Sequence, residues 1–326
     1  MSDGLVVVTG ASGFIGAALG ARLRAAGRPL IGTVREVKAG MPGDLQPVGD
    51  LAHAPDELLD DLVSGAFAVV HLAGRAHVMR ETLADPEGAY HLANAEMTAR
   101  LARASVRGGV RRFVLASSVK AAGEASRPGR PLAPGDAPRP EDAYGRSKRA
   151  AEQELFGIAA GTPMAAAALR LPLVYGRHAR GNFARLVAAV RARKALPFAS
   201  IDNRRSLLYL GNLLDAIEAM LDVPQMPPGV HYVADAESVS TPDLVRAIAS
   251  AWRVEPRLAA MPVPLLRAAG LLLGRGAAVA RLTGSLEVDT TSFREGTGWT
   301  PRWSLDAALA EVAAGRDPRG AHARSL

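Results

Sequence analysis

The sequence contains no cysteine, which excludes disulfide bonds and thiolate chemistry. Aromatic residues make up only 5% of the chain, and its 39 lysines and arginines are scattered along it. A protein that binds nucleic acid by base stacking would need clustered aromatic side chains. The net charge of +7 therefore indicates an arginine-rich solvated surface combined with a pocket for a small anionic ligand, and no nucleic acid partner.

Long apolar runs are also missing. No stretch reaches the roughly 20 apolar residues that a bilayer span requires. The richest segment, MPVPLLRAAGLLLGRGAAVARL at 261–282, is interrupted by prolines and arginines. We expect a helix there that is buried or faces a partner, with contact to a membrane surface as the alternative. The N-terminus lacks the layout of a signal peptide, so we expect a cytoplasmic protein with no membrane span and no metal.

What is present is a glycine-rich turn in LVVVTGASGFIGAALGARLRAAG, residues 5–27. Leu5–Val8 shows no polar alternation, which predicts a strand buried on both faces, and apolar residues then recur at helical spacing. Such a turn directs backbone N–H groups and the positive helix end at a phosphate. Gly10 and Gly13 leave room for a pyrophosphate, and Gly16 lets helix and strand pack closely. The pattern predicts a dinucleotide site.

The stretch TGASGFIG at 9–16 resembles the Thr-Gly-x-x-Gly-x-x-Gly fingerprint of the extended short-chain dehydrogenase/reductases, which include nucleotide-sugar epimerases, dehydratases and ketoreductases. The similarity continues along nearly the whole chain. It implies an α/β fold, a Rossmann-type doubly wound parallel sheet with a smaller C-terminal substrate-binding domain. We expect the dinucleotide-binding domain over 1–176 and the substrate domain mainly over 177–326, with segments from about 205 to 235 returning to the sheet.

The alternation of strands and helices agrees with this fold. Helices are expected at 88–107 and 143–159, and a loop rich in proline and glycine at 123–142 is expected to cover a site. Further strands are predicted at 29–34, 67–74, 111–118 and 164–176.

The end of the second strand bears on the choice of cofactor. A carboxylate there would bind the ribose 2′-hydroxyl of NAD, whereas an arginine suits the 2′-phosphate of NADP. Val34 stands at the expected acidic position and Arg35 follows it, with Glu36 as the rival acid. We therefore expect NADP, with NAD as the alternative.

The resemblance also implies which residues contact the cofactor. They come from the glycine-rich turn, from an adenine-side Asp-hydrophobic pair, from the small residues beside the nicotinamide ribose and from the catalytic helix. The expected cofactor-binding residues are Gly10, Ser12, Gly13, Phe14, Ile15, Gly16, Arg35, Asp50, Leu51, Leu72, Ala73, Gly74, Tyr144 and Lys148.

Tyr144 and Lys148 in YGRSK lie four residues apart and share one helix face. A tyrosine with its ordinary pKa near 10 is a poor catalyst at neutral pH, but an ammonium group and a cationic nicotinamide would lower that pKa. The resemblance places the catalytic hydroxyl five residues before a glycine, which selects Ser118, before Gly123, as the third catalytic residue. Ser117 is expected to cap the backbone.

The chain lacks a pair of acidic residues that some members of the family use for catalysis. The family's dehydratases carry Asp-Glu directly after the catalytic hydroxyl, and this chain has Val119 and Lys120 there. The comparison with these dehydratases therefore argues against sugar dehydration. Oxidation or reduction at a carbinol carbon remains, either as the net reaction or as a step of epimerisation.

The resemblance implies contacts to a UDP-sugar as well. Asn182, Arg205 and Arg281 match diphosphate ligands, and Phe198 lies where uracil is held. His77 is a candidate for the sugar pocket. Segments of the chain resemble bacterial polysaccharide-cluster enzymes, which favours reduction of a UDP-4-keto-6-deoxy-N-acetylhexosamine. The alternatives are a UDP-sugar 4-epimerase and, more distantly, a non-catalytic dinucleotide sensor.

We also expect a homodimer. In the family, helices equivalent to 88–107 and 143–159 pair across a two-fold axis. The second helix carries apolar residues that exceed one core stripe, namely Ala150, Ala151, Leu155 and Ile158.

Overall fold

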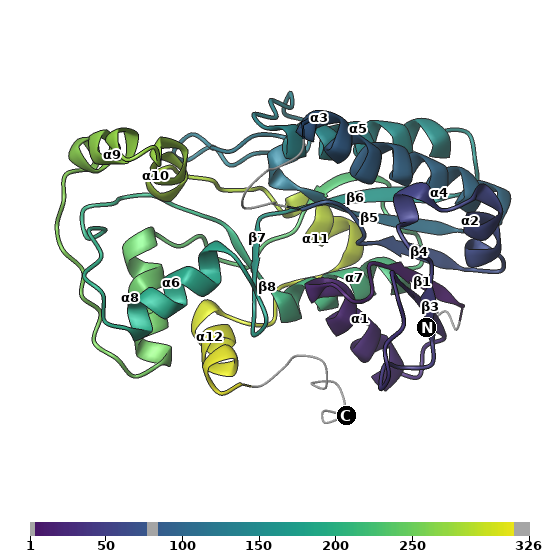
Figure 1. The fold of residues 1–326 in the computed structure, drawn as a ribbon, viewed down its shortest axis with the longest axis horizontal. Helices are drawn as coiled ribbons and strands as arrows, with labels where there is room; N and C mark the ends of the chain where they lie inside the picture. Colours follow the sequence, from purple (N-terminus) through teal and green to yellow (C-terminus); the bar gives the residue numbers. More distant parts are fainter. Residues whose placement is uncertain (1–3, 77–83, 316–326) are drawn as a thin grey trace.

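A computed structural model describes residues 4–76 and 84–315. Its centre is a seven-stranded sheet in the order β3-β2-β1-β4-β5-β6-β9, in which every pairing is parallel (Figure 1). The strands are β1 (Val6–Thr9), β2 (Leu30–Val34), β3 (Leu45–Pro47), β4 (Ala68–His71), β5 (Arg112–Ser118), β6 (Ala165–Leu171) and β9 (Gly229–Tyr232). The expected doubly wound sheet is confirmed.

Helices cover both faces of this sheet, as its uninterrupted apolar strands require. On one face, α1 (Phe14–Ala25), α7 (Leu210–Asp222) and α11 (Thr291–Thr297) pack against Val6 and Val8. On the other, α2 (Asp56–Val63), α4 (Met97–Arg107) and α5 (Ala143–Ala159) pack against Val7. Alternate residues of β1 thus belong to two cores, and the prediction of a strand buried on both faces is confirmed.

The helix expected at 88–107 is interrupted near its start. It consists of α3 (Pro86–Tyr90), a π-helical turn η2 (His91–Glu96) and α4. A π turn inserts an extra residue into the helix and commonly marks a functional site. The shorter 3-10 turns are η1 (Leu51–His53) and η3 (Val119–Ala121).

The strand expected at 164–176 is divided at Pro172, which has no N–H to continue the ladder. Residues before it form β6, whereas β7 (Leu173–Tyr175) pairs with β8 (Leu207–Tyr209) in a separate two-stranded sheet. Of the segments expected to return to the large sheet, β9 does so, but β8 does not.

The C-terminal part of the chain adds a smaller lobe beside the sheet (Figure 1). Its core joins Phe183, Val245 and Leu309. The remaining helices are α6 (Asn182–Arg191), α8 (Thr241–Ala251), α9 (Val263–Leu272), α10 (Gly276–Thr283) and α12 (Leu305–Ala313). No helix in the described ranges is long and apolar enough to cross a bilayer.

Two expectations concerned apolar surfaces. The segment 261–282 forms two helices, α9 and α10, whose leucines are largely exposed, so burial is wrong and a face for a partner or a membrane surface stays a prediction. On α5, Ala151 and Leu155 lie in the core of the single chain, and Ala150 and Ile158 pack against that core. Ala151 and Leu155 are therefore not available to a partner, whereas Ala150 and Ile158 are only partly buried.

Candidate active site

The glycine-rich turn depends on its glycines for geometric reasons. Gly10 has a φ of +69°, and a Cβ there would lie 2.9 Å from the backbone nitrogen of Ala73. At Gly16 a Cβ would collide with the carbonyl oxygen of Gly10. Ser12 and Gly13 are exposed, and no side chain caps the N-terminus of α1. The N–H groups of the first helical turn are thus free of side-chain acceptors, as a phosphate site requires.

Thr9 connects this turn to the end of β4. Its hydroxyl oxygen accepts hydrogen bonds from the backbone N–H groups of Leu72 and Ala73 at 3.2 and 3.1 Å. The same oxygen lies 2.6 Å from Nδ1 of His71. Burial and the nearby charge of Lys148 lower the pKa of His71 to about 3, so its ring is neutral and Nδ1 accepts the Thr9 proton. The contact fixes the position of Leu72, Ala73 and Gly74.

Tyr144 is placed by close packing between α5 and the loop after β5. A Cβ on the neighbouring Gly145 would collide with the carbonyl oxygen of Lys120. Tyr144 forms a side-chain hydrogen bond with Ser118, and its ring meets Tyr90 edge-on with centroids 6.0 Å apart. The two predicted catalytic hydroxyl groups therefore lie together.

The charge state of Tyr144 differs from the expectation. Burial raises the pKa of its phenol to about 12, and the Ser118 hydrogen bond opposes that rise. The protein alone therefore keeps Tyr144 protonated at neutral pH, and the expected lowering by Lys148 is not seen. Stabilisation of a phenolate would need the additional positive charge of an oxidised nicotinamide.

Lys148 is buried one helical turn further along α5. Its Nζ donates a hydrogen bond to the carbonyl oxygen of Ala116 at 2.8 Å and lies near Gly74, where a Cβ would be 3.5 Å away. Burial lowers the pKa of Lys148 to about 8, although the carboxylate of Glu152 acts in the opposite direction. The ammonium group thus lies between the ends of β4 and β5, where the nicotinamide ribose is expected.

Asn94 is a site residue that the sequence analysis missed. It lies in the π-helical turn, is fully buried, and donates to Ser147 Oγ at 2.9 Å. Its side chain also exchanges hydrogen bonds with both backbone groups of Arg75. Asn94 therefore fixes the chain after Gly74 to the catalytic helix. A lone asparagine within an apolar helix gave no recognisable pattern.

Ser117 does not cap the backbone as expected. Its hydroxyl donates to Glu152 Oε1 at 2.6 Å, and Arg170 forms two hydrogen bonds to the same carboxylate at 2.9 and 2.7 Å. Both members of this ion pair are fully buried. Ser118 is the residue that caps, because its Oγ accepts from the backbone N–H of Lys120.

Lys120 stands at a position where dehydratases carry an acid, and here it forms ion pairs beside the catalytic helix. Its Nζ pairs with Asp142 at 2.5 Å and with Glu124 at 2.7 Å. Asp142 also caps α5 by accepting from the N–H of Gly145. The side chain is therefore engaged in holding the N-terminus of the catalytic helix and offers no acid for dehydration.

The predicted diphosphate arginines are brought together. Arg205 donates to the carbonyl oxygens of Arg281 and Gly284 at 2.7 and 2.9 Å. Arg281 in turn pairs with Glu124 at 3.5 Å, which links it to Lys120 beside the catalytic loop. A chain of contacts thus runs from the smaller lobe to the catalytic residues.

The other predicted ligands are less closely tied to the site. Asn182 is exposed at the first position of α6, and Phe198 is half-buried against the core of the smaller lobe. His77 lies outside the described residues.

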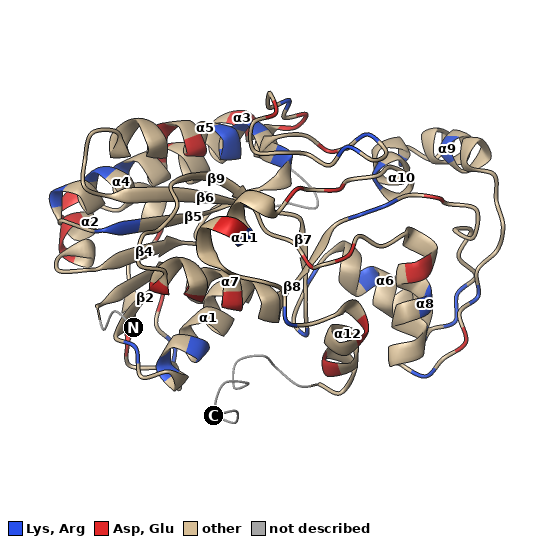
Figure 2. Cartoon of the chain, turned by 180° about the vertical axis from the view of Figure 1, so that it is seen from behind, with Lys and Arg blue, Asp and Glu red and all other residues tan. Residues whose placement is uncertain are grey.

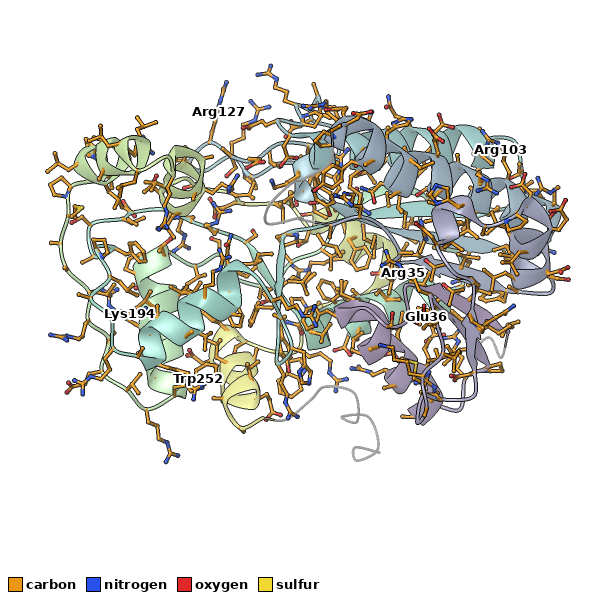
Figure 3. The ribbon with its side chains drawn as sticks, in the orientation of Figure 1. Arg35, Glu36, Arg103, Arg127, Lys194 and Trp252 are labelled. Carbon is orange, nitrogen blue, oxygen red and sulfur yellow. The ribbon has the colours of Figure 1, made fainter. Side chains whose placement is uncertain are left out.

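On the cofactor side, the turn residues Phe14 and Ile15 are half-buried behind Gly13. Leu51 is buried in a 3-10 turn that Asp50 caps. Arg35 and Glu36 are both exposed after β2 (Figure 3). The backbone N–H of Ala11 donates a hydrogen bond to the carbonyl oxygen of Thr33 in that strand, so the two turns are adjacent.

Comparison with known proteins agrees with these features. The sequence profile of the NAD dependent epimerase/dehydratase family matches residues 6–234. The chain is 35% identical over 310 residues to a UDP-glucose 4-epimerase of Vibrio cholerae, with 94% of each chain covered. It is 25% identical over 268 residues to an N-acetyl-alpha-D-glucosaminyl-diphospho-ditrans,octacis-undecaprenol 4-epimerase of Escherichia coli O157:H7, covering 81% of this chain and 77% of that one.

Among solved structures, MoeE5 in complex with UDP-glucose and NAD matches with a TM-score of 0.76 at 28% identity, covering 95% of this chain and 98% of that one. The chain therefore belongs to the NAD-dependent epimerase/dehydratase family. It is an enzyme of the extended short-chain dehydrogenase/reductase type, as its fingerprint predicted.

Proposed function

We propose that this protein is a UDP-sugar 4-epimerase that uses NAD. The observation that carries the proposal is the hydrogen bond between Tyr144 and Ser118, with the ammonium group of Lys148 held between the ends of β4 and β5. The similarity to the Vibrio cholerae UDP-glucose 4-epimerase supports the choice of epimerisation over net reduction. The NAD found with MoeE5 supports the choice of cofactor.

The residues present suit a dinucleotide. Gly10 and Gly16 leave no room for a Cβ, and the exposed Gly13 begins α1 without a side-chain cap. These groups would hold the pyrophosphate, and Lys148 would hold the nicotinamide ribose. When bound, NAD supplies reversible oxidation and reduction at carbon 4 of the sugar.

The protein's own contribution is to manage one proton at the carbon-4 oxygen. Ser118 would hold that oxygen by a hydrogen bond, and Tyr144 would take its proton during oxidation and return it during reduction. Because burial keeps Tyr144 protonated by itself, the tyrosine acts as a base only when positive charge lies close by. Lys148 is a buried cation one helical turn along the same face of α5.

On the substrate side, Arg205 and Arg281 would neutralise the diphosphate of the sugar nucleotide. Burial lowers the pKa of Arg205, and two backbone carbonyl oxygens hold its guanidinium in place. A guanidinium held in this way presents its remaining N–H groups to an anion without a further loss of side-chain freedom.

Net reduction of a UDP-4-ketosugar is the second candidate, and Arg35 favours it. This arginine follows β2, no acid stands at Val34, and an NADP 2′-phosphate would find a cation there. Glu36, the next residue, is the acid that would instead accept the ribose hydroxyl of NAD.

The test is the identity of the cofactor and of the product. We expect the purified protein to retain NAD and to convert UDP-glucose or UDP-N-acetylglucosamine into its carbon-4 epimer without added cofactor. Consumption of added NADPH with a UDP-4-ketosugar, together with no epimer from either UDP-sugar, would establish the reductase instead.

A further inference from the structure

The two helices α9 and α10, residues 263–283, form an exposed apolar hairpin at the outer edge of the smaller lobe (Figure 1). Leu265, Leu271, Leu272 and Leu273 are 61%, 72%, 89% and 73% exposed. Single exposed leucines are ordinary, but a cluster of them marks an interaction surface. Four of the six large exposed apolar residues in the described chain lie on this α9–α10 hairpin.

The hairpin has a defined packing that separates an inner from an outer face. Gly270 is buried, and a Cβ on it would lie 2.6 Å from the side chain of Val279 on α10, so the helices approach closely there. Arg267 Nε donates to Thr283 Oγ1 at 3.2 Å. Leu265 and Leu272, seven residues apart, therefore share an outward stripe of α9.

The charge around this stripe has one sign. Residues 256–286 contain four arginines and not one aspartate or glutamate. Figure 2 shows blue but no red on α9 and α10, whereas the helices on the opposite side of the molecule carry both colours. Arg267 and Arg275 are exposed beside the leucines. Leucines flanked by arginines without carboxylates are typical of helices that lie at the surface of an anionic membrane.

We propose that the α9–α10 hairpin docks the enzyme on an anionic membrane surface. The exposed leucines enter the boundary between headgroups and acyl chains, and Arg267 and Arg275 contact lipid phosphates. The last turn of α10 contains Arg281, whose carbonyl oxygen accepts a hydrogen bond from Arg205. Docking therefore brings the diphosphate end of the substrate site to the membrane surface. This proposal does not depend on which carbon-4 reaction the enzyme performs.

The experiment is flotation of the full chain with vesicles of phosphatidylcholine alone or mixed with phosphatidylglycerol. We expect binding to the anionic vesicles, weakened by salt. Leu272→Glu is expected to reduce the partition coefficient at least tenfold, and Arg275→Ala about fivefold. Lys194→Glu removes an exposed cation from another part of the smaller lobe and serves as the matched charge control, with binding unchanged (Figure 3).

Three results would overturn the proposal. The first is no binding to phosphatidylglycerol vesicles at physiological salt, and the second is equal binding of wild type and Leu272→Glu. The third is a wild-type oligomer that Leu272→Glu dissociates in the absence of vesicle binding, which would make the hairpin a contact between copies. Because Leu272 is so exposed, the variant should fold, and Leu273→Glu provides a second variant if it does not.

Discussion

At the scale of single residues, substitutions of Tyr144 and Lys148 should have different effects on turnover and on cofactor affinity. Tyr144→Phe removes the acid–base group and keeps the ring against Tyr90, so turnover should fall by a factor of about 100 to 10,000 while cofactor affinity is retained. Lys148→Met should lower both, because its ammonium group also lies where the ribose binds. Steady-state turnover and cofactor titration separate the two effects.

The control for Tyr144→Phe is Tyr175→Phe, which removes another buried phenol hydroxyl. Tyr175 donates to Asp235 at 3.0 Å and lies outside the catalytic cluster. Its loss should leave turnover near that of wild type. If Tyr144→Phe stays within about threefold of wild type, short of the range for general acid–base catalysis, Tyr144 is not the catalytic residue.

The lowered pKa of Lys148 also predicts how the unfolding free energy depends on pH. Its pKa is lowered from 10.5 when unfolded to about 8 when folded. Between these two values the unfolded chain holds the proton and the folded chain does not, so wild-type stability rises with pH in that window. Relative to Lys148→Met, cofactor-free wild type should thus gain unfolding free energy from pH 8 to 10.5.

Denaturant titrations of both proteins across this pH range test the prediction. Other titrating groups cancel in the difference between wild type and variant. If the difference in unfolding free energy stays constant or falls with pH, folding does not lower the pKa of Lys148.

The sequence predicts the catalytic residues better than it predicts the residues that hold them in position. Ser118, Tyr144 and Lys148 stand in a recognisable pattern, and the structure brings Ser118 to Tyr144. Thr9 belongs to the fingerprint, but its contacts to β4 depend on which strands are neighbours. Asn94, in the π turn, joins two parts of the chain that are far apart in the sequence, Arg75 and Ser147.

At the scale of elements, the approach of α5 to the loop after β5 depends on Gly145. Gly145→Ala would place a methyl group against the carbonyl oxygen of Lys120 and displace Tyr144 from Ser118. We expect loss of most activity and a lower melting temperature. Gly157→Ala on the same helix has no neighbour near its Cβ and should stabilise by about 0.5–1 kcal/mol.

Thermal melts and turnover of both glycine variants form the test. Equal behaviour of the two would show that the helix tolerates a methyl group at Gly145. The contact would then not position Tyr144.

The buried ion pair between β6 and α5 is a second test at this scale. Glu152→Gln would leave Arg170 as an uncompensated buried charge and should cost about 3–5 kcal/mol of unfolding free energy. The matched control is Glu154→Gln on the same helix, whose exposed pair with Arg103 is worth at most about 1 kcal/mol. Chemical denaturation of both variants measures the difference, and equal losses would contradict a structural role for the buried pair.

Elements are predictable where the local pattern is complete. The helix expected at 143–159 matches α5, because Asp142 caps its start and its apolar spacing persists to the end. The strand expected at 164–176 is split, because Pro172 releases β7 to a different sheet. The apolar composition of 261–282 indicated a helix that is buried or faces a partner, and the packing of Gly270 on Val279 uses only one side of the hairpin.

At the scale of the whole molecule, we still expect a homodimer, on the resemblance of α4 and α5 to the pairing helices of the family. Of the four residues first chosen on α5, Ala151 and Leu155 do not support it, since they belong to the chain's own core. Light scattering at micromolar concentration should give twice the mass of the chain. A monomeric mass would contradict the expectation.

The central claim is reversible oxidation at carbon 4 of a UDP-sugar, and the most direct measurement is the NMR spectrum of UDP-glucose incubated with the enzyme in deuterium oxide. The account predicts that UDP-galactose accumulates to equilibrium and keeps the original hydrogen on carbon 4, with no net consumption of added cofactor. Tyr144→Phe should slow this conversion by about 100-fold or more. Deuterium at carbon 4, or conversion by Tyr144→Phe at the wild-type rate, would contradict the account.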